Sequence, residues 1–152
     1  MALKQITDTL LAALSQQAQH SPRRRANHNL HEELSDPIQR LAIAMEPDTV
    51  VLPHRHPYTW ELLFPLRGRF LVLHFDEAGT VIARSVLGED CKLLENPAGI
   101  WHSVLSLDRG GVIFEVKHGP YAPLAEADCK AVADTAALLA WYANARIGER
   151  LA

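Results

Sequence analysis

The sequence predicts a mainly β protein, built as one antiparallel sandwich or barrel with α-helical segments at both ends. From about residue 38, short runs of β-branched, aromatic and aliphatic residues alternate with turn sequences. Turns every 8–12 residues are typical of antiparallel sandwiches and barrels. Both flanks carry apolar residues at helical spacing instead. The length of 152 residues is that of one domain, with 48% apolar and 22% charged residues.

The first helix is predicted over residues 3–19 and must end before Ser21-Pro22, because the residue before a proline avoids helical geometry. Its apolar positions recur every three or four residues: Leu3, Ile6, Leu10, Leu11, Leu14 and Ala18. The basic run Arg23-Arg24-Arg25 follows and is expected to be a solvated linker.

Eight strands are expected in the central region. They are Ile38–Met45, Thr49–Leu52, Trp60–Pro65, Arg69–Phe75, Val81–Leu87, Lys92–Glu95, Trp101–Leu107 and Gly111–Lys117. The Ala-rich stretch Leu124–Ile147 predicts one or two helices packed outside the β core.

Charge and cysteine content exclude several classes of protein. Fifteen basic and 18 acidic residues give a net charge of −3, which disfavours nucleic-acid binding. No apolar run approaches the ~18 residues of a membrane span, and the first residues do not resemble a signal peptide. Cys91 and Cys129 cannot form a disulfide framework. We therefore expect a cytoplasmic protein without nucleic-acid or membrane partners.

Histidine is the unusual residue, with eight in the chain. His54 and His56 are two apart, so on a strand both imidazoles would project to one face. Glu61 and Gly68 follow at fixed spacing, and a second cluster reads Pro97-x-Gly99-x-x-His102.

The pattern H-x-H-x4-E-x6-G followed by P-x-G-x-x-H resembles the two motifs of the cupin superfamily, small jelly-roll β-barrels. The resemblance implies one divalent metal held by His54, His56, Glu61 and His102. Asp48, Cys91 and Ser106 stand where the motifs usually have Gly, Gly and Asn, none of them ligand positions. Three imidazoles and one carboxylate suit Fe, Mn, Ni, Co, Cu or Zn.

The flanks resemble one subgroup, the WbuC-type cupin-fold metalloproteins, whose genes often lie among bacterial O-antigen and surface-polysaccharide genes. The matching segments are Arg25–His31, Asp36, Gln39-Arg40, Pro53–His56, Pro97–His102 and Phe114–Tyr121. The resemblance covers roughly residues 23–121, the expected metal-binding barrel. With the helices expected from apolar spacing, an N-terminal helix at 1–22 and a C-terminal helical segment at 122–152, the barrel forms one structural domain. The resemblance also implies a homodimer.

Further residues are candidates for contacts with a small-molecule ligand. A polar cluster before the barrel could face a ligand if this segment crosses the barrel mouth: Arg25, Asn27, Asn29 and His31. Arg40 follows on the first expected strand. Glu115 and Lys117 share one face of a strand, either inside the barrel or toward solvent. Tyr58 either donates a proton or hydrogen bond in the site or is a packing residue. Tyr121 is the last residue of the segments that match the subgroup. Tyr58, Glu115 and Lys117 are the catalytic candidates.

Two functions remain open from the sequence. One is a metal-dependent enzyme, of isomerase, epimerase or dioxygenase type, acting on a small polar or anionic, sugar-related ligand. The other is a metal-dependent sensor that binds such a ligand without turnover. A metal-free sugar epimerase is a weaker alternative, because all four ligand positions are intact.

Overall fold

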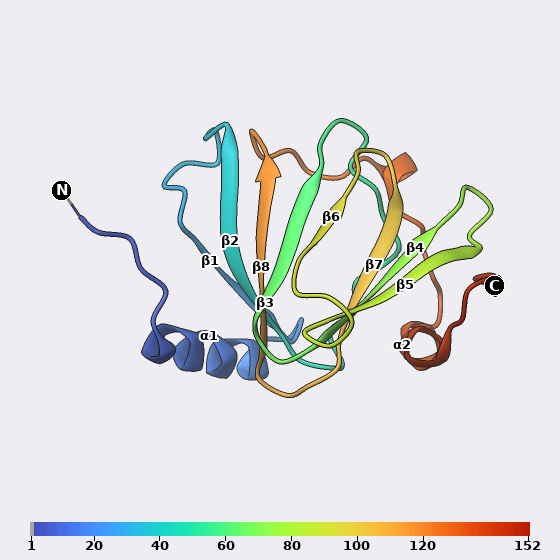
Figure 1. Cartoon of the computed structure of the whole chain (residues 1–152), viewed down its shortest axis with the longest axis horizontal. Helices are drawn as coiled ribbons and strands as arrows, with labels where there is room; N and C mark the ends of the chain where they lie inside the picture. Colours follow the sequence, from blue (N-terminus) through green and yellow to red (C-terminus); the bar gives the residue numbers. More distant parts are fainter. Residues whose placement is uncertain (1) are drawn as a thin grey trace.

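The computed structural model describes residues 2–152. In this range two α-helices flank eight strands (Figure 1). In chain order the elements are α1 (Asp8–His20), β1 (Arg25–Asn29), β2 (Ile38–Met45), β3 (Glu61–Arg67), β4 (Phe70–Phe75), β5 (Val81–Leu87), β6 (Leu94–Asn96), β7 (Trp101–Ser106), β8 (Gly111–His118), the 3₁₀ turn η1 (Glu126–Asp128) and α2 (Thr135–Asn144).

The strands form two antiparallel sheets, with orders β1-β2-β8-β3-β6 and β5-β4-β7. The prediction of a mainly β fold with flanking helices is confirmed. Over residues 2–152 the ladder of paired strands does not close into a barrel, and the two sheets form a sandwich, one of the two architectures that the turn spacing predicts.

Alternation along the strands creates three apolar layers. Between the sheets lie residues from both inner faces, among them Ile43, Leu63, Val104 and Ile113. The outer face of the larger sheet packs against α1, and the outer face of the smaller sheet packs against α2 (Figure 1). Each helix therefore covers the outer apolar face of one sheet, the face that does not contact the other sheet.

Helix α1 begins later than its apolar spacing predicts. Thr7 caps it, accepting a hydrogen bond from the Leu10 backbone N–H at 3.2 Å. Leu11, Leu14 and Ala18 are buried against the sheet. Leu3 was expected on this apolar face, but it lies outside the helix and is 78% exposed.

Two predictions near the start of the β region are wrong. Thr49–Leu52 is not a strand, because its backbone bonds elsewhere: Thr49 N–H donates to Glu46 O, and Val51 O accepts from the Tyr142 hydroxyl at 2.9 Å. The segment 25–29 is the paired edge strand β1, although Arg25 was expected in a linker. The side chains of this segment are mostly polar, so the sequence pattern does not indicate a strand. The segment is a strand because its backbone pairs with β2.

The other strands lie where they were expected, with shifted ends. Strand β3 continues past Pro65, which lacks the N–H of a regular ladder, through a register shift between Pro65 and Arg67. Gly68 follows with φ +72°, a left-handed conformation that glycine adopts without strain and that turns the chain into β4.

The C-terminal region is helical only in part. Of the expected 124–147 stretch, Thr135–Asn144 forms α2 and Glu126–Asp128 a single 3₁₀ turn. The residues before α2 bond to the loop between β2 and β3 instead: Arg55 N–H donates to Asp128 O, and Lys130 N–H to Pro53 O, both at 2.9 Å. These tertiary hydrogen bonds replace the helical ones.

Candidate metal centre

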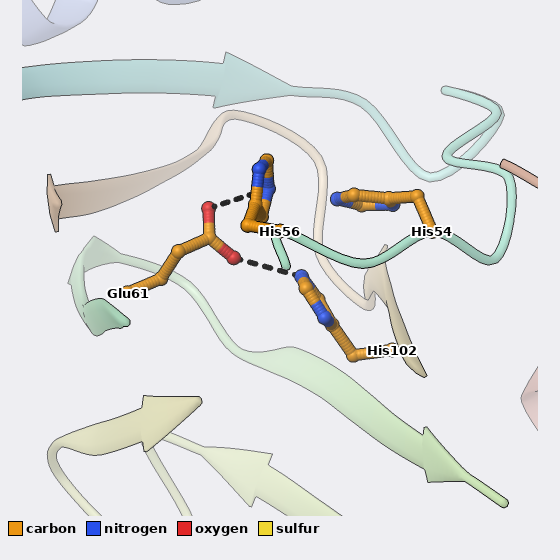
Figure 2. A group of neighbouring side chains, drawn as sticks. All are labelled: His54, His56, Glu61 and His102. Carbon is orange, nitrogen blue, oxygen red and sulfur yellow. Dashed lines mark ion pairs between the residues drawn. The ribbon is translucent and has the colours of Figure 1, made fainter. Parts of the chain in front are cut away.

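The four motif residues converge from three parts of the chain (Figure 2). His54 and His56 lie on the loop between β2 and β3, Glu61 is the first residue of β3, and His102 is the second residue of β7. One ligand atom from each lies within 4.8 Å of the other three. A single ion can therefore contact all four side chains.

Backbone hydrogen bonds between the two motifs hold this arrangement. His54 and His102 exchange both hydrogen bonds, at 3.0 and 2.9 Å. Gly99 N–H donates to His56 O at 2.8 Å from a left-handed turn with φ +83°. The expected strand geometry for His54 and His56 is therefore replaced by a loop docked on β7 and on the turn before it.

Hydrogen bonds at Nδ1 orient two of the imidazoles. His54 Nδ1 lies 2.8 Å from Leu52 O, and His102 Nδ1 lies 3.0 Å from Ile100 O. A carbonyl only accepts, so each Nδ1 carries the proton and leaves Nε2 with a lone pair. Burial, followed by the charge of nearby His102, lowers the pKa of His54 to about 4. This keeps His54 neutral, as a metal ligand must be.

Glu61 is the buried anion of the cluster. Its Oε1 lies 2.8 Å from His102 Nε2, and its Oε2 lies 3.2 Å from His56 Nε2. Burial opposes its ionisation, but the hydrogen bond from Glu115 and the contacts of its oxygens with His102 and His56 hold the pKa of Glu61 well below its usual range. Two acceptors facing each other at 2.8 Å require a cation between them, either a proton or a metal ion.

Glu115 touches Glu61 from the neighbouring strand β8. Burial and the Glu61 carboxylate raise the pKa of Glu115 well above its usual range. The Glu115 carboxyl therefore stays protonated and donates to Glu61. Lys117 lies 3.7 Å from Glu115, measured from Nζ to Oε2. Glu115 and Lys117 thus face the interior, the first of the two possibilities left by the sequence.

A polar chain supports Glu61 from its other side. Asn96 Nδ2 donates to Glu61 Oε1 over a long 3.4 Å, while Asn96 Oδ1 lies 2.6 Å from His74 Nε2. These contacts fix the amide orientation and make His74 Nε2 the donor. Sequence reasoning did not identify Asn96 or His74 as part of the site. The signal was slight: Asn96 directly precedes the proline of the second motif.

A cavity of about 440 Å³ opens beside the cluster. Its wall includes Arg25, Glu115, Lys117 and Tyr121 from the expected candidates, together with Arg23 and Cys129, which were not expected. Apolar residues from both sheets and the 50–52 segment complete it: Ile43, Met45, Val50, Val51, Leu52, Leu63, Val104 and Ile113.

The remaining candidates lie away from this cavity. Asn27 and Asn29 bond each other at 2.8 Å on the exposed edge strand β1. His31 is buried and accepts the Arg40 backbone N–H at 2.9 Å, while the Arg40 side chain pairs with Asp36 at 3.1 Å. Tyr58 is 93% exposed. The 25–31 segment runs along the edge of the larger sheet instead of crossing a barrel mouth.

Residues 6–87 match the model of a family described as a domain of unknown function, DUF6016. The chain belongs to the DUF6016 family. No curated protein matches this DUF6016 protein. Among the residues the structure describes, no helix is long and apolar enough to cross a membrane.

Solved structures similar to this DUF6016 protein are cupins. KdgF from Halomonas sp. aligns with TM-score 0.52 and 14% identity over 68% of this chain and 85% of its own. Oxalate oxidase in complex with glycolate aligns with TM-score 0.55 and 14% identity over 70% of this chain and 57% of its own. The 11S allergen from Cocos nucifera L. aligns with TM-score 0.55 and 18% identity over 68% of this chain and 30% of its own. The cupin fold is thereby confirmed. An oxidase and an 11S allergen share it, so the fold does not define activity.

Proposed function

We propose that this protein is a metal-dependent cupin that binds a small organic anion beside a centre of three histidines and one glutamate. The observation that carries the proposal is the convergence of His54, His56, Glu61 and His102 within 4.8 Å on the wall of a cavity. Lone pairs on Nε2 and a buried carboxylate form a donor set that suits a first-row transition metal.

The donor set would leave coordination positions open for a ligand. Four protein ligands leave one or two positions open on a five- or six-coordinate ion, where a bound metal supplies Lewis-acid polarisation of a ligand oxygen. The chain itself supplies the rest of the site: Arg25 and Lys117 attract a negative charge, and Glu115 holds a proton against Glu61. The resemblance to WbuC-type proteins adds sugar-related acids of surface-polysaccharide metabolism to the ligands worth testing.

The first experiment is elemental analysis of protein purified without an affinity tag. We expect one transition metal per chain, or uptake of one equivalent of Zn, Fe, Mn or Ni. A protein that contains no metal and takes up none of these would refute the metal centre. The exposed-histidine variant His20→Ala is the control and should keep full occupancy.

Turnover separates the two functions that the sequence left open. Oxygen uptake or product formation with an added anion would identify an enzyme, and tight binding without product would identify a sensor. The cytoplasmic location and the homodimer stay predictions. Cys91 and Cys129 are free thiols, which is compatible with a reducing compartment, and sedimentation analysis would test the dimer.

A further inference from the structure

The cavity contains more positive charge than its acids neutralise. Arg23, Arg25 and Lys117 line it together with Glu61 and Glu115. Three basic side chains therefore face two carboxyl groups among the lining residues in the range 2–152. A bound divalent metal would add two further positive charges.

Two of these cations have no carboxylate partner. Arg55 and Arg69 each lie 2.8–3.1 Å from a carboxylate oxygen, but within residues 2–152 no carboxylate lies within 4.0 Å of Arg23 or Arg25. Arg23 is exposed, whereas Arg25 is half-buried, and burial followed by the charge of Arg23 lowers the pKa of Arg25 although Glu115 opposes the shift. An anion in the cavity would give this half-buried guanidinium an acceptor.

The rest of the wall is apolar. Inward-facing residues of the two sheets, such as Ile43, Leu63 and Val104, and the 50–52 segment form it. Apart from the ionisable side chains, Tyr121 is the polar residue there: none of the lining residues described in 2–152 is Ser, Thr, Asn or Gln. Each hydroxyl of a buried sugar would need a hydrogen-bond partner, and this wall offers few side chains for that purpose.

The mouth of the cavity continues this apolar surface. Tyr121 is 50% exposed and Leu124 is 41% exposed, and both belong to the lining. A hydrocarbon body that extends outward from the charged groups would cover both side chains and bury apolar area.

We propose that the cavity takes an amphipathic organic acid, whose carboxylate is attracted by the positive charges of Arg25 and Lys117 and whose body is an aliphatic chain or aromatic ring rather than a polyhydroxylated sugar. This inference rests on the proposed function, because it specifies the ligand of the same cavity.

Hexanoate and gluconate provide a matched pair of probes. Both have six carbons and one carboxylate, and they differ in the five hydroxyls of gluconate. In calorimetric titrations of the metal-loaded protein, we expect hexanoate to bind at least tenfold more tightly than gluconate. 3-Phenylpropionate should resemble hexanoate, and inorganic phosphate, which has no apolar body, should bind more weakly than either.

Variants test each part of the cavity. Arg25→Gln and Lys117→Gln should each weaken hexanoate binding at least tenfold, whereas Arg84→Gln, at an exposed arginine outside this cavity, should leave it unchanged. Val104→Thr keeps the side-chain size and adds a hydroxyl to the wall, so it should reduce the preference for hexanoate over gluconate. Circular dichroism confirms that each variant folds.

Gluconate binding as tightly as hexanoate, or hexanoate binding that survives Arg25→Gln and Lys117→Gln, would overturn the inference. Binding of neither organic acid by a protein with one metal per chain would overturn it as well. Elemental analysis reads out the metal centre independently, so failure of the proposed function is recognised by missing metal rather than by the choice of acid.

Discussion

Acid should destabilise the metal-free protein through His54. Burial lowers the pKa of this imidazole to about 4 in the folded state, whereas a histidine in the unfolded chain titrates near ~6.5. Below pH 6.5 the unfolded state therefore binds a proton that the folded state does not. Stability must fall as pH drops from 6.5 toward 4, and above 6.5 this group has no effect.

The size of the effect follows from the two pKa values. Each unit of difference corresponds to about 1.4 kcal/mol. At pH 5 the free energy of unfolding should be lower by about 2 kcal/mol than at pH 8, and the loss should level off at about 3.4 kcal/mol below pH 4. Other groups also titrate in this range, so the contribution of His54 has to be isolated by substitution.

The assay is urea unfolding at pH 8 and pH 5, followed by circular dichroism in the presence of a chelator. His54→Gln keeps a donor for Leu52 O but does not titrate, so it should lose about 2 kcal/mol less than wild type between the two pH values. His20→Gln, at an exposed histidine, is the matched control and should follow wild type. If His54→Gln shows the full wild-type loss, then His54 is not held neutral by burial and the reasoning is wrong.

Five substitutions test other parts of the structure. Glu61→Ala should lower metal occupancy at least as much as His102→Ala, because it removes the one carboxylate of the four ligands; full occupancy in both would show that the ligand assignment is wrong. Lys117→Ala should leave metal content near wild type, since a protonated lysine does not ligate. Asn96→Ala should weaken metal affinity by about 10–100-fold without unfolding the protein, as loss of a group that orients a ligand commonly does; unchanged affinity in a metal titration would refute the supporting role. Tyr142→Phe should cost about 1 kcal/mol of stability in urea, because it removes the hydroxyl donor to Val51 O; wild-type stability would show that this bond contributes nothing.

Part of the site could be predicted from the sequence because its ligands occur at fixed local spacings. His54, His56 and Glu61 lie within eight residues, and Pro97-x-Gly99-x-x-His102 contains the glycine whose left-handed turn positions the last histidine. Strands β2, β5 and β8 could also be predicted, because short runs of β-branched, aromatic and aliphatic residues between turn sequences indicate strands.

The rest depended on contacts between distant residues. Strand β1 has no apolar alternation, and only pairing with β2 shows that residues 25–29 are extended. Conversely, Thr49–Leu52 has a strand-like composition, but Glu46 and Tyr142 take its hydrogen bonds. The local sequence pattern indicates which side chains favour burial, whereas the tertiary fold decides which backbone groups bond to one another.

The sequence by itself determined the β-rich class, through short apolar runs between turns, and its resemblance to the two cupin motifs indicated the four donors of a candidate metal centre. Only the tertiary structure decided what surrounds those donors. It brought Arg25 from the edge strand and Lys117 from β8 to one cavity, set Glu115 against Glu61, and left Asn27, Asn29 and Tyr58 outside. The physical reason is that side-chain charge and burial depend on neighbours dozens of residues away, which strand pairing and sheet packing bring together.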